Sequence, residues 1–590
     1  MSGSPLRGQK WWERVSLSPE VLVLTLATVL GGGTGLCVVA FRWLIDWVHR
    51  GAFETLMGWL GGWGAWSLAL VPWLGGLLVG GLGWLVQRWP VLSTRYALGR
   101  LGLAALSLGM GASLGPEGPS VDVGVHWGRT LAQRLRVSQE RSLVLQAAGA
   151  AAGLAAGFNA PIAGAFFAFE VVLGTTFTGS AVPIVLLAAV VGGWVAQAGL
   201  GAQPAFSLPP YEVRSPWELP LYLGLGVLAS GLAVVYTAAV EGCKPGVIRG
   251  VPRWLQPAVG GAVIGLLALV LPQTLGVGYE TIEAMLQNVE FSWGLLLTLI
   301  PVKLGLTVVS YATGWVGGLF APALFLGAAL GSAYGQVVGQ GLAGLVTIAD
   351  PPAYAMVGMA ALLACSTRAP LTAILLLFEL TRDYVIILPA MAAVGLSIWL
   401  LDQVYPQGAP IGLHSLDREE QRFMGDLRVA DAMIPPPLVV PPERSLGKVA
   451  QMLMERQKHT ALVVNGQQEL IGLLTPQDIQ RAVRTHGVLW YSVPVGEWCT
   501  QELQTIYPDQ SLEQARQRML TRGLCQLPVV SRGANPQLLG LLEKERIETI
   551  QKLALTQRVL AQGVAADTPA PKTAAGSPDG QNGGQAVGWL

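Results

Sequence analysis

The chain has 590 residues, of which 52% are hydrophobic and only 12% are charged, and it contains 75 glycines. A mean hydropathy of +0.50 excludes an ordinary soluble protein. The net charge of +1 gives no sign of a nucleic-acid partner, and none is expected. The five cysteines are scattered singly, so neither a disulfide framework nor a metal site is expected.

The chain begins with a polar segment, 1–19, which we expect to lie in the cytoplasm. The apolar run after it has no small-residue cleavage site, which predicts an uncleaved first span. Nearly uncharged runs at 21–40, 221–239, 291–309 and 384–401 are each roughly long enough to cross a hydrocarbon core. We therefore expect a membrane domain over 20–404 and a linker over 405–426, followed by a water-soluble region.

The stretch GASLGPEGPS, at 111–120, places Glu117 among glycines and prolines inside apolar sequence. Proline is tolerated in the first helical turn and glycine frees the preceding backbone, so a helix is expected to begin here within the membrane. Such an interrupted helix is tolerated where its exposed backbone lines a cavity. The stretch GGLFAPALFLGAALG has the same character and predicts a second such helix.

These two stretches belong to an internal repeat, with halves at about 20–200 and 220–404. At one offset of 203, four residues of the first half recur in the second: Gly115, Pro119, Gly124 and Gly128 match Gly318, Pro322, Gly327 and Gly331. In this register Glu117 is aligned with Phe320. A second match, NAPIAGAFFAFE with RAPLTAILLLFE, follows at an offset of 209. The alternative is chance similarity between glycine-rich helices; a true repeat predicts a site where the halves meet.

Two helix N-termini that converge in a membrane favour an anion, because each presents unpaired N–H groups and about half a positive charge. An ionised carboxylate at the bilayer centre costs about 2.5 to 3.5 kcal/mol. At a helix N-terminus, however, Glu117 is itself an anion and a tethered competitor for a permeant ion. Burial disfavours its charged form, so protonation would release it. The alternative is a helix-capping glutamate that faces water.

Beyond the linker, two segments at 427–485 and 493–550 share one pattern. Each predicts an extended segment, a helix, two short apolar strands and a closing helix. The last 30 residues, 561–590, are too poor in apolar residues to fold, and disorder is expected there.

The motifs of the membrane part resemble those of the CLC family of chloride channels and chloride/proton exchangers. SLGPEGPSV is similar to the family's G-R-E-G-P signature, with Pro116 in place of its arginine. GLAAGFNAPIAGAFFAFE, GWVGGLFAPALFLGAALG and RAPLTAILLLFELTRDY resemble three further family segments. The tail resembles a pair of CBS modules.

The resemblance implies a mainly α, polytopic membrane protein of inverted-repeat architecture with a C-terminal α/β CBS pair. It also implies a homodimer with one pathway per subunit for chloride or another small anion, gated by Glu117. Backbone amides would line the anion sites at Gly115, Gly118, Leu319 and Phe320. The expected location is the plasma (inner) membrane, with the CBS tail in the cytoplasm.

Two departures concern the central anion site. The family's G-S-G-I-P motif is missing before Glu117, and Ser93 and Thr94 lack its glycine framing. The position of a family tyrosine falls on Gly412, with Tyr405 as a substitute if the register slips. Loss of both hydroxyls would leave a wider or less selective inner vestibule.

A third departure concerns proton coupling. Val171 occupies the position of the exchangers' internal proton relay, directly after Glu170, for which we expect a structural role. Because valine cannot titrate, we favour a chloride channel with passive conduction gated by Glu117 protonation. A proton-coupled chloride/proton antiporter remains the alternative.

In nucleotide-binding CBS pairs a G-x-x-T-x-x-D turn contacts phosphate and ribose. Here the first module has Gly472, Thr475 and Asp478, whereas the second has Glu543 and Arg546 in place of Thr and Asp. We favour a structural dimerisation role, with adenine-nucleotide binding as the alternative and no cofactor required. Thr475 before Pro476 is also simply a good helix start.

Two other classes of protein fit the sequence less well. A membrane metalloprotease needs an H-E-x-x-H helix, but none of the five histidines is followed by Glu, so we do not expect an enzyme. A CBS-bearing divalent cation transporter needs several oxygen ligands facing a pore. The apolar spans offer Glu117, Glu170 and Glu379, but the latter two end equivalent repeat segments. This reading remains a remote alternative.

Overall fold

The computed structural model describes residues 19–550, apart from 60–63, 90–92, 136, 175–178, 202–217, 244–247, 249, 290, 343–347, 406–426, 459, 534–535 and 548. The predicted N-terminal segment, linker and tail therefore lie almost wholly outside the described residues. The chain forms two compact units, Met1–His414 and Ser415–Leu590, and each is considered by itself.

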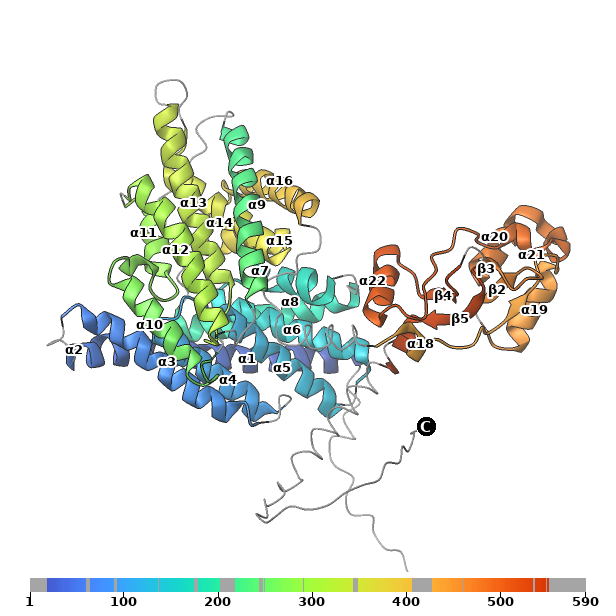
Figure 1. Ribbon diagram of the computed structural model, residues 1–590, viewed down its shortest axis with the longest axis horizontal. Coiled ribbons are helices and arrows are strands. Elements are labelled where there is room, and N and C mark those ends of the chain that lie inside the picture. The colour runs from blue at the N-terminus through green and yellow to red at the C-terminus, as the bar shows by residue number, and fades with distance from the viewer. Residues whose placement is uncertain are drawn as a thin grey trace, which may run out of the picture. The chain divides into compact units, whose positions relative to one another are not determined.

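Among the described residues of the first half of the membrane unit, the named elements are all helices (Figure 1). Its helices are α1 (Pro19–Arg50), α2 (Met57–Trp59), α3 (Trp66–Val86), α4 (Thr94–Gly109), α5 (Glu117–Leu135), α6 (Gln139–Phe158), α7 (Pro161–Phe167) and α8 (Val182–Leu200). Two π-helical stretches, Gly51–Leu56 and Ala168–Leu173, continue α1 and α7, and a 3₁₀ turn, Gly179–Ala181, precedes α8.

The second half repeats this plan. Its helices are α9 (Glu218–Gly242), α10 (Gln256–Ala268), α11 (Tyr279–Leu286), α12 (Trp293–Ala312), α13 (Phe320–Gly341), α14 (Pro351–Thr367), α15 (Pro370–Thr381) and α16 (Ile387–Val404), with a 3₁₀ turn over Pro272–Thr274. The first two motifs that the sequence singled out therefore start α5 and α13, which confirms the predicted helix starts.

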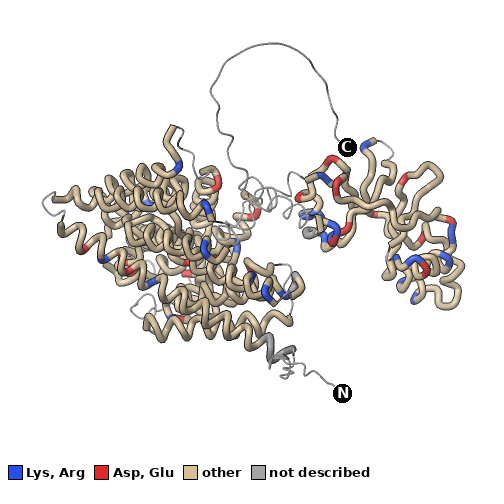
Figure 2. Tube along the Cα trace, turned by 90° about the horizontal axis from the view of Figure 1, so that it is seen from below, with Lys and Arg blue, Asp and Glu red and all other residues tan. Residues whose placement is uncertain are grey.

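Seven of the described helices are long and apolar enough to cross a membrane. They lie at Leu24–Trp59, Trp66–Val86, Gly179–Leu200, Glu218–Gly242, Trp293–Ala312, Phe320–Gly341 and Ile387–Val404. All four predicted spans overlap members of this set, and three of them begin two or three residues earlier than the helix. Figure 2 shows that charged residues are sparse along this unit and more frequent in the C-terminal one, as a lipid environment requires.

Close glycine contacts recur at matching places in the two halves. In the first half α5 packs on α6 where Gly124 meets Gly149, and a β-carbon on either would collide with the other's backbone. In the second half α13 packs on α14 in the same way, where Gly327 meets Gly358. Only glycine lets two helix backbones approach so closely in a membrane protein.

The C-terminal unit contains two small helix and strand modules. Their helices are α18 (Val429–Ala432), α19 (Leu446–Glu455), α20 (Pro476–His486), α21 (Val495–Trp498) and α22 (Leu512–Arg522), with a 3₁₀ segment over Gly487–Ser492. Their strands are β1 (Val439–Val440), β2 (Ala461–Val464), β3 (Leu470–Leu474), β4 (Gln526–Val530) and β5 (Leu538–Glu543).

The two modules share one strand pattern. In the first, β1 runs parallel to β2, which pairs antiparallel with β3. In the second, a parallel bridge from Ile506 to Val529 takes the place of β1, and β4 pairs antiparallel with β5. The helix and two strands predicted for each module are confirmed, with α20 closing the first and helical residues 544–547 following β5 in the second.

Candidate functional site

The starts of α5 and α13 meet inside the membrane unit. Gly115 and Gly318 exchange two backbone hydrogen bonds, with N···O distances of 2.8 and 2.6 Å. A β-carbon on Gly118 would lie only 2.9 Å from the Cα of Gly318. The predicted site residues Gly115, Glu117, Gly118, Leu319 and Phe320 are therefore brought together from the two halves of the chain.

Glu117 bridges the two helices through its side chain. Although it is the first residue of α5, its Oε1 accepts hydrogen bonds from the backbone N–H groups of Phe320 and Ala321, each at 2.8 Å. The side chain is buried, with 1% exposure. Its Oε2 is also buried and has no hydrogen-bond partner among the described residues. One oxygen thus uses the free N–H groups of α13, and the other retains unused acceptor capacity.

Space for this carboxylate exists because both flanking positions lack a side chain. A β-carbon on Gly318 would lie 2.7 Å from Oε1 of Glu117, and one on Gly115 would collide with the same carboxylate. Only glycine at these two positions leaves a cradle in which two backbone N–H groups face a negative group. The contact crosses the repeat, so Glu117 reaches the position that the sequence register assigned to its counterpart, Phe320.

Three side chains near the carboxylate were not identified from the sequence. Tyr236 of α9 is fully buried and donates its hydroxyl proton to the carbonyl oxygen of Leu319, at 2.8 Å. Tyr279 and Arg42 both lie close enough to Glu117 to interact with it electrostatically. A phenol inside an apolar span is normally a packing residue, so no sequence signal marked Tyr236. Arg42 could have been found from the sequence, because an arginine within a long apolar helix marks a possible functional site.

Glu170 and Glu379 form a second link between the halves. Glu170 accepts hydrogen bonds from the N–H groups of Leu371 and Thr372, at 2.9 and 2.8 Å, and from the Thr372 hydroxyl at 2.5 Å. Glu379 accepts from the N–H groups of Ile162 and Ala163, at 2.9 and 2.7 Å. Each carboxylate therefore caps the short helix of the other half, as helix N-termini favour.

Val171 follows Glu170 in the π-helical stretch and packs against the main apolar core. The position after Glu170 thus carries no titratable group, while both oxygens of Glu170 accept hydrogen bonds from α15. The structural role expected for Glu170 agrees with these contacts.

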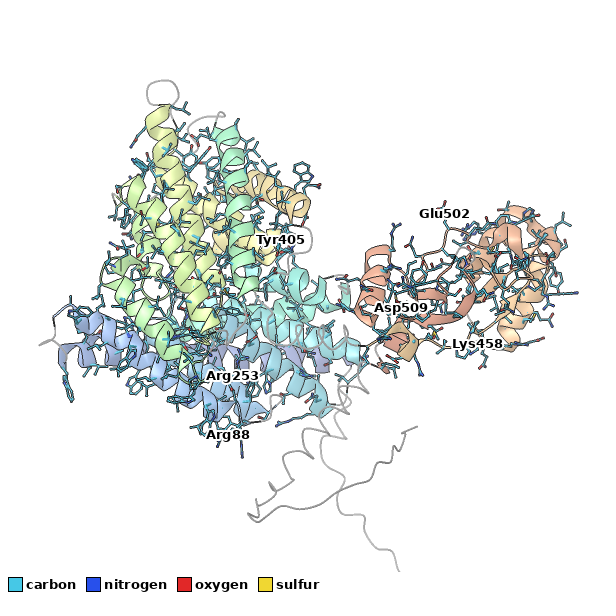
Figure 3. The ribbon with its side chains drawn as sticks, viewed as in Figure 1. Arg88, Arg253, Tyr405, Lys458, Glu502 and Asp509 are labelled. Carbon is cyan, nitrogen blue, oxygen red and sulfur yellow. The ribbon has the colours of Figure 1, made fainter. Side chains whose placement is uncertain are left out.

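Two of the hydroxyl-bearing residues considered for the central site, Ser93 and Tyr405, have other partners. Ser93 caps α4, where its Oγ accepts a hydrogen bond from Tyr96 N at 3.2 Å. Tyr405, at the end of α16 (Figure 3), donates its hydroxyl proton to Glu241 at 2.7 Å. Gly412 lies outside the described residues.

Lys303 is a fully buried cation in α12. Its ammonium donates hydrogen bonds to the carbonyl oxygens of Thr274 and Gly276, at 3.0 and 2.7 Å, and lies 4.9 Å from the ring centre of Phe325. Gly278, with φ of +88°, has no room for a β-carbon between Phe325 and the ammonium. Lys303 therefore fixes the loop that leads into Tyr279. A lone lysine in an apolar run was a sequence signal that the span prediction passed over.

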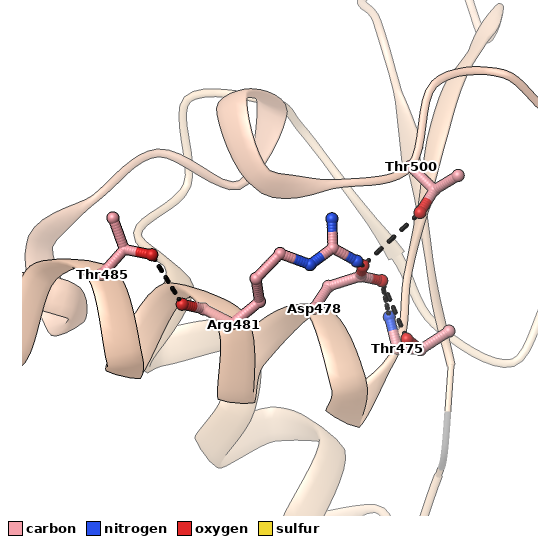
Figure 4. A network of polar contacts seen from close by, with 5 residues as sticks. All are labelled: Thr475, Asp478, Arg481, Thr485 and Thr500. Carbon is pink, nitrogen blue, oxygen red and sulfur yellow. Dashed lines mark hydrogen bonds and ion pairs between the residues drawn. The ribbon is translucent and has the colours of Figure 1, made fainter.

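In the C-terminal unit, the predicted nucleotide residues form a closed polar network (Figure 4). Oδ2 of Asp478 accepts hydrogen bonds from the N–H and hydroxyl of Thr475, at 2.9 and 2.8 Å. Oδ1 accepts from Arg481 at 2.7 Å and from the Thr500 hydroxyl at 3.5 Å. Asp478 is 2% exposed, so its carboxylate is committed to the start of α20, as the N-cap reading of Thr475 predicts.

The surroundings of Gly472 are also filled. A β-carbon on this residue would collide with the Cys499 sulfur and lie 3.0 Å from the carbonyl oxygen of Thr500. Burial raises the pKa of the Cys499 thiol. Gly472 and Asp478 of the first module therefore pack against Cys499 and Thr500, at the start of the second segment.

A separate pocket of about 360 Å³ lies between the two modules. Lys458 (labelled in Figure 3) and Thr460 line it from the first module, and Gln526, Glu543 and Lys544 from the second. The hydroxyl of Thr460 donates to Oε1 of Gln526 at 2.6 Å, which joins the two modules at the pocket wall. The pocket carries charges of both signs and does not include Gly472, Thr475 or Asp478.

Comparison with known proteins agrees with this architecture. The family model for the voltage gated chloride channel matches residues 87–402, and the CBS domain model matches 429–485 and 495–548. The chain therefore belongs to the voltage gated chloride channel (CLC) family, an anion-transporting family of multi-span integral membrane proteins. The resemblance read from the motifs is confirmed.

Named relatives lie on both sides of the channel and exchanger division. The chain is 32% identical to the chloride channel protein CLC-f of Arabidopsis thaliana, over 92% of this chain and 82% of that protein. It is 34% identical to the H(+)/Cl(-) exchange transporter ClcA of Vibrio cholerae, over 52% of this chain and 65% of that protein. It also resembles the crystal structure of a slow cyanobacterial Cl-/H+ antiporter, with 25% identity and a TM-score of 0.60, over 68% of this chain and 99% of that one.

Proposed function

We propose that this protein is an anion channel of the CLC type, in which chloride crosses passively and the protonation of Glu117 opens the path. The observation that carries the proposal is the Glu117 carboxylate bound to the N–H groups of Phe320 and Ala321. An anionic oxygen occupies the donors that an anion in transit would use. The carboxylate and the permeant ion therefore compete for one place.

Protonation would end this competition. A neutral carboxyl group is a weaker acceptor than a carboxylate, because hydrogen bonds to charged groups are roughly twice as strong. Once released from Phe320 and Ala321, the side chain leaves two backbone N–H groups for the anion. Backbone donors without a full cation hold an ion weakly enough for it to leave again.

Two features of the π-helical stretch that continues α7 favour passive conduction. Val171 cannot carry a proton, and Glu170 beside it is engaged by the N–H groups of α15. A proton-coupled chloride/proton antiporter is the second candidate, favoured by the exchanger ClcA and the cyanobacterial antiporter among the similar proteins.

The voltage across liposomes that contain the full chain distinguishes the two candidates. Under a chloride gradient, a channel brings the voltage to the chloride Nernst value whatever proton gradient is imposed. A reversal potential that shifts with the proton gradient would establish the antiporter instead. Protein-free liposomes serve as the control for leak.

The gate itself is tested by Glu117→Gln, which imitates the protonated side chain. In the unchanged protein, chloride flux should fall as the pH rises, by up to about tenfold per pH unit for a single titrating carboxyl. The variant should conduct at the acid level at every pH. Glu379→Gln is the matched control, since its carboxylate lies outside the proposed gate and its pH profile should follow the parent. An unchanged profile in Glu117→Gln refutes the gate.

For the C-terminal unit, we propose a role in dimerisation, with the chain a homodimer in the plasma (inner) membrane and the CBS pair in the cytoplasm. The internal bonds of Asp478 support this role, since a ribose would have to displace Arg481 and Thr500. Cross-linking of the full chain in membranes should yield a dimer. Saturable binding of ATP, ADP or AMP that is lost in Asp478→Ala would establish the nucleotide alternative.

A further inference from the structure

One face of α12 is polar, although this helix is long and apolar enough to cross a membrane. Lys303, Thr307 and Ser310 are spaced by four and three residues, which places their side chains on the same face of a helix. All three are fully buried. The hydroxyls of Thr307 and Ser310 donate their protons to carbonyl oxygens of α12 itself, at 2.8 and 2.7 Å. Each hydroxyl oxygen therefore remains an acceptor for a further contact.

This face of α12 holds the pre-gate segment, residues 111–116, which leads to Glu117. The N–H group of Ser113 donates to the hydroxyl oxygen of Ser310, at 3.3 Å. The hydroxyls of Ser113 and Thr307 lie 3.1 Å apart, and Ser113 is the donor because the Thr307 proton is already used. Ser113 is fully buried. Both its backbone and its side chain are therefore fastened to α12.

Lys303 is connected to the same segment through a loop. Its ammonium donates to the carbonyl oxygens of Thr274 and Gly276. The N–H group of Gly276 in turn donates to the carbonyl oxygen of Gly111, at 3.2 Å. Gly111 has a φ of +94°, and a β-carbon on it would lie only 3.1 Å from Leu275. The loop therefore joins Lys303 to the first residue of the pre-gate segment.

The contact through Thr307 has no counterpart in the other half of the repeat. The serine contacts are reciprocal at the offset of 203, where the matching pairs are Ser113 with Ser310 and Val316 with Ser107. The N–H group of Val316 donates to the hydroxyl oxygen of Ser107 at 3.2 Å. Thr307, by contrast, corresponds to Ala104, whose side chain cannot form a hydrogen bond. The additional contact thus falls on the half of the repeat that carries the Glu117 carboxylate.

We propose that Lys303, Thr307 and Ser310 are positioning residues for the gate, which fix the pre-gate segment where Glu117 can reach the N–H groups of α13. The carboxylate belongs to one helix and its donors to another, so a shift of the pre-gate segment would lengthen both hydrogen bonds. Weaker bonds to the charged form make protonation easier. The inference rests on the proposed function, since it concerns how the closed gate is held.

Other groups that face Glu117 also act on its charge. The titratable and charged side chains are Tyr236 of α9, Tyr279 of α11 and Arg42 of α1, all of which interact with the carboxylate electrostatically. From α13 it receives the two backbone N–H groups. A variant of Thr307 leaves all of these groups in the chain, so a shift in its pH profile reports the position of the carboxylate.

The test measures chloride flux against pH in liposomes that contain the full chain. Thr307→Val keeps the shape of the side chain but removes the acceptor for Ser113. The pH of half-maximal flux should rise by about one unit, the change expected when the charged form loses the equivalent of one hydrogen bond. Lys303→Met should shift the midpoint in the same direction. Thr298→Val is the matched control, because Thr298 is exposed on the same helix and bonds the carbonyl oxygen of Gly294.

A second background separates positioning from general damage to the fold. In Glu117→Gln no carboxylate is left to be positioned, so adding Thr307→Val should leave the flux and its pH profile unchanged. Ser113→Ala removes the same contact from the other side and should reproduce the shift, which covers the event that a variant in α12 fails to fold.

The outcomes distinguish this proposal from the proposed function. A midpoint that is unchanged or lowered in Thr307→Val or Ser113→Ala overturns the positioning role, and so does an equal change of flux in the Glu117→Gln background. Chloride conduction and the gate would then stand. Flux that keeps its pH dependence in Glu117→Gln alone overturns the gate itself.

Discussion

The two links between the halves of the membrane unit differ in symmetry. Glu170 and Glu379 are equivalent residues of the repeat, and each caps a helix of the other half, so this link is reciprocal. At the other link Glu117 reaches across to α13, but its counterpart Phe320 sends no carboxylate back. Reciprocal contacts hold the halves together, whereas the unpaired contact leaves the anionic group that the proposed gate requires to be displaced. The proposed gating group therefore lies at the link where the two halves of the repeat carry different side chains.

The largest effect on stability is expected from Glu170→Ala or Glu379→Ala. Each removes a carboxylate that satisfies backbone donors at a helix start, and charge-assisted hydrogen bonds are worth about 1.5 to 3 kcal/mol each. Either change should therefore lower the free energy of unfolding by about 2 to 4 kcal/mol, after discount for partial exposure. The midpoint of thermal unfolding in detergent measures this. Glu54→Ala, at an exposed carboxylate, is the control, and a loss in only one of the two variants would contradict reciprocity.

A somewhat smaller loss is expected from Lys303→Met. The variant fills the space of the side chain but leaves the carbonyl oxygens of Thr274 and Gly276 without the ammonium. Two lost hydrogen bonds in a buried site should cost about 2 kcal/mol. Hydrogen exchange of the amides from 274 to 279 should become faster. Gly305→Ala, in the same helix and in open space, is the control; equal exchange in both variants would deny Lys303 its clamping role.

The difference between the two reciprocal carboxylates can be removed by Thr372→Val. Glu170 has one hydrogen bond more than Glu379, from the Thr372 hydroxyl. Its loss should cost about 1 kcal/mol, the usual contribution of one such bond. In the Thr372→Val background, Glu170→Ala and Glu379→Ala should then cause equal shifts in the unfolding midpoint. Shifts that remain unequal would show that the Thr372 hydroxyl is not the source of the difference between Glu170 and Glu379.

The smallest change in stability is expected from Glu117→Gln. The amide oxygen can still accept from Phe320 and Ala321, and a buried charge is removed, so the two effects nearly cancel to within about 1 kcal/mol. The unfolding midpoint should hardly move, although the pH dependence of flux is lost. A loss as large as that of Glu170→Ala would mean that Glu117 is a structural cap.

Local sequence rules predicted much of the site. Glycines and prolines around Glu117 and Phe320 marked the helix starts, because these residues act on the backbone of their own segment. The repeat register then placed Glu117 opposite Phe320. Recognition of the family motifs supplied the wider architecture of the membrane unit and of the CBS pair.

Local sequence rules could not predict the hydrogen-bond partners of the carboxylates. A structural role was predicted for Glu170, but its acceptance of hydrogen bonds from Leu371 joins residues some 200 positions apart. Such a pairing depends on how the two halves pack. Tyr236 gave no signal because a buried phenol looks like any other packing residue, and its bond to Leu319 emerges only in three dimensions. Lys303 was visible in the sequence as the one charged residue of its apolar helix, and Arg42 as an arginine within a long apolar helix.

The reciprocal caps also bear on the speed of opening. Rocking of one half against the other, a common motion of transporters with repeats, would break the bonds of Glu170 and Glu379 together. Rotation of the single Glu117 side chain breaks none of them. Side-chain rotation takes nanoseconds to microseconds, whereas collective motions of domains take microseconds to milliseconds. In the proposed gate, the reciprocal contacts between the halves therefore leave the fast rotation of Glu117 as the route to an open path. The arrival of a proton, and not a rearrangement of the fold, would then set the rate of opening.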